Sequence, residues 1–383
     1  MPMAEPLPTA VPARTLTHRK VKVGVVGCGK ISDAYFKGMG HYDILEVVAC
    51  ADLDVARARA KAAQHGLARG GPVEELLADP AIEIVVNLTI PQAHVEVNER
   101  ALRAGKHVYV EKPFALASSD GRRVLSLAQS FGRRVACAPD TFLGGGIQTC
   151  RKLIDDGAIG RPVSALAFCM GHGHESWHPA PEFYYQKGGG PMFDMGPYYL
   201  TALVNFFGPV ARVSGSSQTA FPERTITNPE RLGQKIKVET PTHLTGVLDF
   251  ASGVSVTMVM SFDVWSYPLP QIVVFGTEST LEVPDPNVFN GTVRLRSADG
   301  KSYEPVPLTH SGERLRGTGV ADLAYAIRTG RPHRATGELA NHVVEVMEAF
   351  EKSSVTQQHV RIASTCSRPA ALPPGLAAGE LDS

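Results

Sequence analysis

The sequence lacks the features that mark several large classes of protein. It has no net charge, because 38 Lys and Arg balance 38 Asp and Glu, and without a basic excess there is little to attract a phosphate backbone. The longest uncharged run, Met195–Ala211, is interrupted by Gly, Pro and Asn and is shorter than the ~20 apolar residues of a membrane helix. We therefore expect a small-molecule ligand, and neither a nucleic-acid nor a membrane partner.

Cysteine is also sparse. The six cysteines are scattered, form no CxxC pair and mostly have apolar neighbours, which predicts buried thiols in a reducing compartment and no disulfide framework. Residues 1–19 contain four prolines and no apolar core of signal-peptide length, so they are not read as a secretion signal. The sequence thus predicts a cytoplasmic protein that begins with a flexible arm, residues 1–19.

What the chain does contain is material for more than one buried core. It has 383 residues, of which 43% are hydrophobic, enough for two or three domains at roughly 150 residues each. Between residues 20 and 140, short apolar runs alternate with helical stretches, a pattern typical of βαβ units around a parallel sheet. The predicted strands are Val21–Val26, Glu46–Ala51, Ile82–Leu88, His107–Val110 and Arg134–Ala138, and the predicted helices are Val55–Gln64, Gln92–Ala104 and one capped by Ser118 or Ser119.

After Asp140 the pattern changes to strands joined by hairpin turns. We expect a helix over Ile147–Asp156, a mostly antiparallel sheet, and two final helices in a second domain, residues 141–368. The predicted strands are Leu244–Phe250, Val254–Phe262, Ile272–Phe275 and Thr292–Leu295, with turns at Gly253 and Asp299–Gly300 and helices over Val320–Thr329 and Glu338–Lys352. Residues 369–383 are rich in Pro, Ala and Gly, which predicts a disordered tail.

The first motif with chemical content follows the first predicted strand. Gly27-Cys28-Gly29-Lys30-Ile31-Ser32 is a variant of GxGxxG, in which glycines let backbone amides and a helix N-terminus approach a pyrophosphate. Asp52 ends the second predicted strand, where a carboxylate accepts hydrogen bonds from a ribose and repels a 2′-phosphate. This context predicts a Rossmann domain that binds NAD. Lys30 leaves NADP open as the alternative, because its cation either pairs with Asp52 or attracts a phosphate.

A second motif, Gly105-Lys106-His107-Val108-Tyr109-Val110-Glu111-Lys112-Pro113, follows Thr89, Pro91 and His94. Together with Gly188-Gly189-Gly190 and Asp194-Met195-Gly196, it resembles the Gfo/Idh/MocA family of oxidoreductases over about residues 20 to 365. The resemblance implies an N-terminal Rossmann domain with a doubly wound parallel sheet. It also implies a C-terminal α/β domain whose large, mostly antiparallel sheet has one open face.

The same resemblance implies roles for the residues of the motif. Lys112 is expected to contact both the nicotinamide region and a reacting hydroxyl, as an ammonium at the carboxyl edge of the sheet can do. Glu111 is expected to bind ribose, and Pro113 fits a cis peptide bond. Thr89, Pro91 and His94 are implied to line the nicotinamide side, although a buried structural role for His94 stays open.

Many relatives in this family carry a histidine four residues after the aspartate that holds the substrate. Here Asp194 is followed by Tyr198, which is therefore expected to act as the acid or base together with Lys112. An ordinary tyrosine has a pKa near ~10, and we expect the Lys112 cation to lower it. The alternative is that Tyr198 only packs a helix.

His174-Glu175-Ser176-Trp177-His178 matches the HExxH zinc signature. The glycines before it and prolines after it argue against the helix that the signature needs, so we expect no metal. Trp177 and His178, with Glu175 and Glu182, fit a substrate loop that stacks on a sugar ring. Asp140 follows the fifth strand and is a further candidate substrate contact.

The sequence therefore predicts an NAD-dependent dehydrogenase or reductase acting on a ring hydroxyl of a sugar, glycoside or cyclitol. Three alternatives remain: an oxidoreductase that keeps its nucleotide bound, a redox-cycling glycosidase or lyase, and a non-catalytic sensor or repressor of the same fold. The resemblance also suggests a homodimer or homotetramer formed through the open sheet face.

Overall fold

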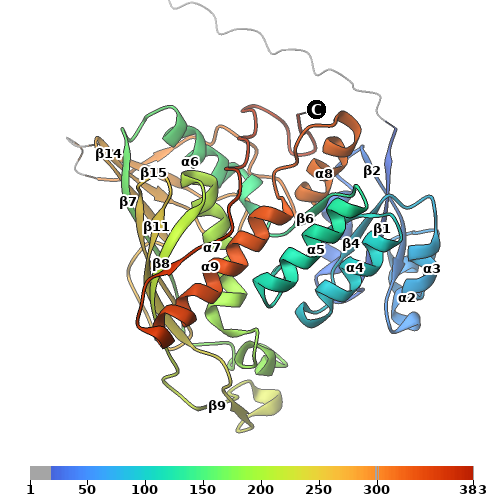
Figure 1. The fold of residues 1–383 in the computed structure, drawn as a ribbon, viewed down its shortest axis with the longest axis horizontal. Coiled ribbons are helices and arrows are strands. Elements are labelled where there is room, and N and C mark those ends of the chain that lie inside the picture. The colour runs from blue at the N-terminus through green and yellow to red at the C-terminus, as the bar shows by residue number, and fades with distance from the viewer. Residues whose placement is uncertain (1–18, 298–299, 301, 383) are drawn as a thin grey trace, which may run out of the picture.

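The computed structural model describes residues 19–297, 300 and 302–382. The first 18 residues of the predicted arm, and Asp299 of the predicted turn, lie outside the described residues. Two sheets form the two halves of the molecule, and Figure 1 shows helices α7 and α9 between them. Among the described residues, no helix combines the length and the apolar character that crossing a bilayer requires.

Sheet A belongs to the N-terminal half and is entirely parallel, in the order β3-β2-β1-β4-β5-β6. This is the strand order of a Rossmann domain, in which the direction of winding reverses between β1 and β4. Its strands are β1 (Val21–Val26), β2 (Leu45–Ala51), β3 (Arg69–Gly71), β4 (Ile84–Asn87), β5 (His107–Val110) and β6 (Val135–Cys137). Its helical segments are α1 (Ser32–Met39), α2 (Val55–Gln64), α3 (Val73–Ala78), η1 (Pro91–Ala93), α4 (His94–Arg103) and α5 (Ser118–Ser130).

The predicted strands of this half are confirmed, and β1 and β5 begin and end at the predicted residues. The apolar runs of β1 and β4 are buried, as expected for strands covered by helices on both faces. Two short elements, β3 and α3, were not predicted, because neither contains enough residues to show a period. The predicted cap is wrong: Ser118 is the first residue of α5 and Ala117 occupies the cap position.

Sheet B has nine strands in the order β16-β15-β14-β13-β7-β12-β11-β8-β17. All its pairings are antiparallel except β7 with β12, which confirms the predicted, mostly antiparallel sheet. Its strands are β7 (Pro162–Met170), β8 (Val210–Gln218), β11 (His243–Phe250), β12 (Ser255–Ser261), β13 (Ile272–Gly276), β14 (Ser279–Val283), β15 (Val293–Ser297), β16 (Glu304–Val306) and β17 (Val360–Arg361). A separate hairpin joins β9 (Glu223–Thr225) and β10 (Lys235–Lys237).

Helices connect sheet B to sheet A. The remaining segments are η2 (Thr141–Leu143), α6 (Gly145–Asp155), η3 (Pro181–Tyr185), α7 (Gly190–Phe207), η4 (Pro229–Arg231), α8 (Thr318–Thr329) and α9 (Gly337–Thr356). Helix α7 packs on β11 and β12, and its residues from Gly196 to Phe207 are buried and mostly apolar. Helix α9 packs on both β8 and α5, so it bridges the two halves.

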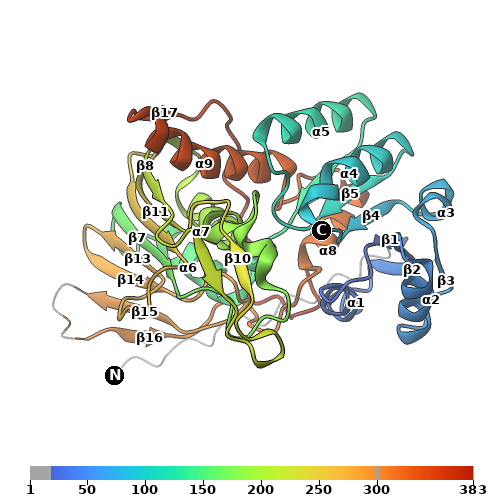
Figure 2. The same ribbon diagram turned by 90° about the horizontal axis from the view of Figure 1, so that it is seen from below.

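The chain returns to the N-terminal half near its end. Helix α8 contacts α1, β5 and β6, and a β-bridge joins Ala136 to Thr336. Figure 2 shows α8 beside the strands of sheet A, with α9 extending from there to sheet B. The loop that leads into α8 is thereby brought next to the carboxyl ends of the parallel strands.

The predicted disorder of residues 369–383 is wrong for the described residues up to Asp382. Leu372 is buried, and its amide donates to Gln148 Oε1 over 2.9 Å. Arg334 Nη2 donates to Asp382 Oδ2 over 2.7 Å, and its Nε donates to the carbonyl of Ala370 over 2.9 Å. The segment has no helix or strand, but it supplies acceptors to an arginine that is itself buried.

Candidate active site

A cleft of ≈ 870 Å³ opens at the carboxyl ends of β1, β4 and β5. Elements of both halves line it, and we call it the main cleft. Its walls come from residues 29–31, 88–92, 111–113, 183–189 (except 185 and 187), 193, 194 and 198. The location is the switch point of the parallel sheet, where this class of fold places ligands.

The glycine-rich loop forms the floor beside β1. Gly27 has φ +98°, and a Cβ there would lie 2.6 Å from the carbonyl carbon of Leu88, so only glycine fits. A Cβ at Gly29 would meet nothing within 4 Å, which leaves the backbone open to a ligand. Helix α1 begins at Ser32 and directs its positive end toward this space. The loop therefore fits a dinucleotide pyrophosphate.

Asp52 lies against the same loop. Its Oδ2 accepts a hydrogen bond from the amide of Cys28 over 2.8 Å, and its Oδ1 accepts one from the amide of Asp54 over 2.9 Å. The cation nearest to it among the described residues is Arg57, 3.6 Å away, so Lys30 does not form the pair that the sequence left open. Instead Lys30 is exposed and lines the cleft. This arrangement fits a ribose held by Asp52.

Thr89 and Pro91 line the main cleft as predicted, but His94 does not. His94 is fully buried, with Nδ1 2.7 Å from the carbonyl oxygen of Pro113 and Nε2 3.0 Å from that of Thr89. Burial lowers its pKa, against the effect of the two carbonyls. The structural role left open for His94 is the one observed: it ties the loop after β4 to the loop after β5.

Glu111 and Lys112 follow β5 directly. Glu111 Oε1 accepts from the hydroxyl of Tyr35 over 2.8 Å, and its Oε2 accepts from the amide of Lys112 over 2.8 Å. The Lys112–Pro113 peptide bond is cis, as predicted. Both side chains of the pair line the cleft.

The ammonium of Lys112 contacts the start of α7. Its Nζ donates to the backbone carbonyl of Asp194 over 2.7 Å and to Asp194 Oδ1 over 3.0 Å. Burial lowers the pKa of Lys112, but the carboxylates of Asp194 and Glu111, together with Tyr198 once it ionises at high pH, outweigh burial and hold the pKa above its ordinary value. Lys112 is therefore a charged hydrogen-bond donor at neutral pH.

Tyr198 lies one turn of α7 beyond Asp194, on the same helix face. Its ring centre is 5.3 Å from Lys112 Nζ, and its hydroxyl accepts from Arg316 Nη2 over 3.1 Å. Burial raises the pKa of Tyr198, and the opposing effect of Lys112 and Arg316 does not cancel it. Lys112 does lower this pKa, as predicted, but burial has the larger effect because the side chain is almost completely buried, so the pKa stays above its ordinary value. Tyr198 is a neutral phenol at neutral pH.

Arg316 was not identified from the sequence. It belongs to the loop before α8, and besides Tyr198 it contacts Asn287 Oδ1 at 3.4 Å and Glu111 Oε1 at 3.9 Å. No local pattern marks it, since it is 118 residues from Tyr198 in the chain. Its guanidinium adds a second cation beside the hydroxyl of the tyrosine.

Asp140 is not a substrate contact. It is fully buried, and its Oδ2 accepts from the amides of Gly317 and Gly319 over 2.9 and 3.0 Å. The prediction placed it correctly after the last parallel strand but could not show that the loop before α8 covers it. Asp140 holds the loop that carries Arg316.

Residues 174–178 form turns rather than a helix, as their glycine and proline neighbours predict. Glu175 makes a buried ion pair with Arg224, which also donates to Asp263 Oδ1 over 2.9 Å. Glu182 pairs with Arg231. The sequence predicted that both carboxylates accept from sugar hydroxyls, but both are paired with arginines and neither lines the main cleft.

Trp177 and His178 do not line the main cleft. Trp177 is 59% exposed, and His178 Nδ1 accepts from the amide of Ala180 over 3.0 Å. The loop instead contributes Phe183 and Tyr184 to the cleft. His174 stacks on Tyr184 with ring centres 3.8 Å apart.

His174 also approaches the start of α7. Its Nε2 lies 3.8 Å from Asp194 Oδ2, and burial lowers its pKa. The sequence marked this residue only as part of HExxH, whereas tertiary packing brings it to Asp194. Two carboxylate oxygens of Asp194 thus face different partners, Lys112 and His174.

The fold and the main cleft are those of an oxidoreductase with an NAD-binding Rossmann domain. Residues 21–138 match the family model described as an oxidoreductase family with an NAD-binding Rossmann fold, and residues 147–282 match the GFO/IDH/MocA C-terminal domain. The chain belongs to the Gfo/Idh/MocA family.

Several relatives have names that specify a reaction. The chain is 27% identical over 350 residues to 1,5-anhydro-D-fructose reductase of Ensifer adhaerens, covering 88% of this chain and 98% of that protein. It is 30% identical over 168 residues to inositol 2-dehydrogenase of Salmonella paratyphi B, covering 43% and 48% of the two chains. Levoglucosan dehydrogenase in complex with NADH and L-sorbose has the same fold, with a TM-score of 0.78 and 18% identity over 91% of this chain and 100% of that one.

Proposed function

We propose that this protein is an NAD-dependent dehydrogenase or reductase that acts on a ring hydroxyl of a sugar, glycoside or cyclitol. The observation that carries the proposal is the convergence of Lys112, Asp194 and Tyr198 at the cleft that also holds the glycine-rich loop. When bound, NAD accepts the hydride from the carbon of a CH–OH group, or NADH returns it. The protein must then hold the substrate and move the hydroxyl proton.

The three side chains divide these tasks. Asp194 accepts hydrogen bonds from hydroxyls next to the reacting one. The Lys112 ammonium donates to the reacting oxygen and stabilises negative charge that develops on it. Tyr198 gives a proton to that oxygen when a carbonyl is reduced, and takes the proton when an alcohol is oxidised.

The protonation states favour one direction at neutral pH. Lys112 is charged and Tyr198 is a neutral phenol, for the physical reasons given above. A site in this state is ready to protonate a carbonyl oxygen, whereas oxidation first requires one of the two groups to lose a proton. We infer that oxidation accelerates as the pH rises.

The names of two relatives agree with this substrate class, since one reduces an anhydro sugar and one oxidises inositol by name. The test is absorbance at 340 nm with NAD, and separately with NADP, across monosaccharides, glycosides and inositols at neutral and alkaline pH. We expect NAD reduction with one substrate class. Bond cleavage without net NADH, or activity only with nucleotide that co-purifies, would support the redox-cycling or bound-nucleotide alternatives instead.

We also propose that copies of the chain associate through sheet B. Val247 on β11 is 39% exposed, and half-buried Leu166 and Val259 lie on the same face of the sheet. Exposed apolar side chains on a sheet favour a partner surface. Light scattering of the purified protein should give the mass of a dimer or tetramer, and the mass of one 41.0 kDa chain would contradict it.

A further inference from the structure

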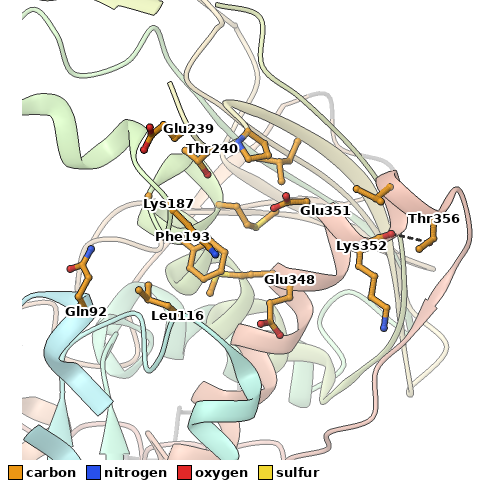
Figure 3. Close-up of a pocket in the computed structure, with 17 residues that line it drawn as sticks. Gln92, Leu116, Lys187, Phe193, Glu239, Thr240, Glu348, Glu351, Lys352 and Thr356 are labelled. Carbon is orange, nitrogen blue, oxygen red and sulfur yellow. Dashed lines mark hydrogen bonds between the residues drawn. The ribbon is translucent and has the colours of Figure 1, made fainter. Parts of the chain in front are cut away.

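A second cavity, of ≈ 700 Å³, opens beside the main cleft. The two cavities share four lining residues, which are Gln92, Gly188, Gly189 and Phe193. Helix α9 and the segment before β11 provide most of its other walls, and Leu116, Lys187, Met192 and Leu244 complete them. Figure 3 shows Phe193 in the middle, Gln92 at one end, and Lys352 and Thr356 at the other. We call this cavity the Phe193 groove.

The Phe193 groove lies next to the proposed catalytic residues. Phe193 precedes Asp194 in the first turn of α7, and Asp194 is hydrogen-bonded to the ammonium of Lys112. The groove and the Lys112–Asp194 pair thus lie on either side of one helical turn. A ligand whose reacting part is held at Lys112 can continue past Gln92 and Gly188 into the groove.

The groove has an apolar floor and a polar rim. The floor consists of Leu116, Met192, Phe193, Leu244 and Met347, and Val355, which is 77% exposed, lies on the rim. On the rim, Glu239 and Glu351 are exposed and Thr240 is half-buried. Glu348 is engaged, because its Oε1 accepts from the amide of Ser118 over 3.2 Å. A floor of this kind suits the C–H face of a sugar ring, and carboxylate and hydroxyl oxygens suit its hydroxyls.

The charges at the groove argue for an uncharged ligand. Three carboxylates line it with the ammonium groups of Lys187 and Lys352, and Lys237 Nζ lies 3.0 Å from Glu239 Oε1. The charges therefore balance, and the lining offers no excess of cations to attract a sugar phosphate or a nucleotide. A neutral ring with several hydroxyls needs no such excess.

We propose that the Phe193 groove binds the second sugar ring of a neutral disaccharide or longer glycoside whose terminal ring reacts at Lys112 and Tyr198. The inference rests on the proposed function and narrows its substrate class from single sugars to glycosides with a second ring.

The test compares matched substrates on the full-length protein with NAD. The pairs are methyl β-D-glucopyranoside with cellobiose, methyl α-D-glucopyranoside with maltose, and methyl β-D-galactopyranoside with lactose. For the pair that reacts, we expect kcat/KM to be about tenfold or more higher for the disaccharide, mainly through KM, because one well-packed ring contributes at least ~1.4 kcal/mol of binding.

Two substitutions at one exposed position separate the groove from the catalytic site. Glu351→Gln removes the charged acceptor, and Glu351→Arg places a long side chain over the groove. Both should reduce the disaccharide preference, the second to within about twofold of the methyl glycoside, and both should leave the methyl glycoside rate unchanged. Glu338→Gln is the matched control, since Glu338 is an exposed glutamate on the same helix that does not line the groove.

Equal kcat/KM for both members of the reacting pair would overturn the inference and leave the proposed function intact. Equal losses on both substrates in Glu351→Arg would overturn it as well. If no pair reacts, the wider panel of sugars and inositols decides on the proposed function, and saturation-transfer NMR with cellobiose, maltose and lactose decides on the groove alone. Binding that Glu351→Arg abolishes would then support it, and absence of binding would overturn it.

Discussion

At the scale of single residues, Lys112 is the group on which the proposed chemistry depends most. We expect Lys112→Ala to lower kcat by about 10²–10⁴-fold, because a positioned acid or charge donor acts on the chemical step. NAD affinity should change little, since the glycine-rich loop follows β1 and Asp52 follows β2, whereas Lys112 follows β5. Steady-state kinetics and NAD titration measure the two effects. Lys235→Ala, at an exposed lysine of β10, is the control, and wild-type turnover in Lys112→Ala would refute the assigned role.

Arg316 provides the prediction on pH. Its cation lowers the pKa of Tyr198 against the dominant effect of burial, so Arg316→Met should raise that pKa further. Oxidation needs the unprotonated form, and its rate therefore rises with pH through the apparent pKa of the Lys112–Tyr198 pair. In Arg316→Met the oxidation rate should therefore rise at a higher pH than in the wild type. In Arg316→Lys, which keeps a positive charge, it should rise at a pH between those of Arg316→Met and the wild type.

The measurement is the pH profile of kcat/KM for oxidation. Arg294→Met, which removes an arginine of β15 paired with Glu282, should leave the profile unchanged. A profile in Arg316→Met that keeps its position while kcat falls would mean that Arg316 only supports the fold.

Residues within short motifs could be predicted from the sequence. Gly29, Asp52 and Lys112 lie where the local strand, turn and helix pattern places them, because each follows a strand of the parallel sheet. Arg316 and His174 could not be predicted, since only tertiary packing brings them to Tyr198 and Asp194.

At the scale of elements, the loop before α8 links the two halves of the molecule. Asp140 Oδ2 accepts two backbone amides of that loop. Asp140→Ala would leave both donors buried and unpaired, and should destabilise the protein by about 2–4 kcal/mol. Asp140→Asn keeps an acceptor oxygen and should therefore lower the free energy of unfolding by less. Urea denaturation measures both variants, and equal stability of Asp140→Ala and the wild type would show that the loop is held by other contacts.

The elements also show where sequence patterns stop being informative. Strands β1 and β5 are short and rich in valine, and the sequence predicts both of their ends correctly, because buried parallel strands favour such runs. The parallel pairing of β7 with β12 joins strands that are far apart in the sequence, and no local pattern predicts it. The C-terminal segment is likewise held by a distant residue, Arg334, which donates to the carbonyl of Ala370. Composition alone read that segment as disordered.

At the scale of the whole molecule, the function depends on two separate sheets meeting at one cleft. Sheet A provides the glycine-rich loop, Asp52 and Lys112, and α7 on the sheet B side provides Asp194 and Tyr198. Neither half contains a complete site. The fold class was predictable because each sheet has its own pattern, while the geometry between them is set by α8 and α9 packing across the boundary.

The most direct test of the central claim is hydride transfer itself. The protein is incubated with NAD and sugars that carry deuterium on every ring carbon, beginning with perdeuterated glucose and its methyl glycosides. The nucleotide is then released by denaturing the protein, and its mass is measured by mass spectrometry. The account predicts nucleotide that has gained one deuterium with the reacting sugar, and almost none in Lys112→Ala over the same time. This readout also detects transfer to nucleotide that never leaves the protein. Unlabelled nucleotide with every sugar and cyclitol tested would contradict the account.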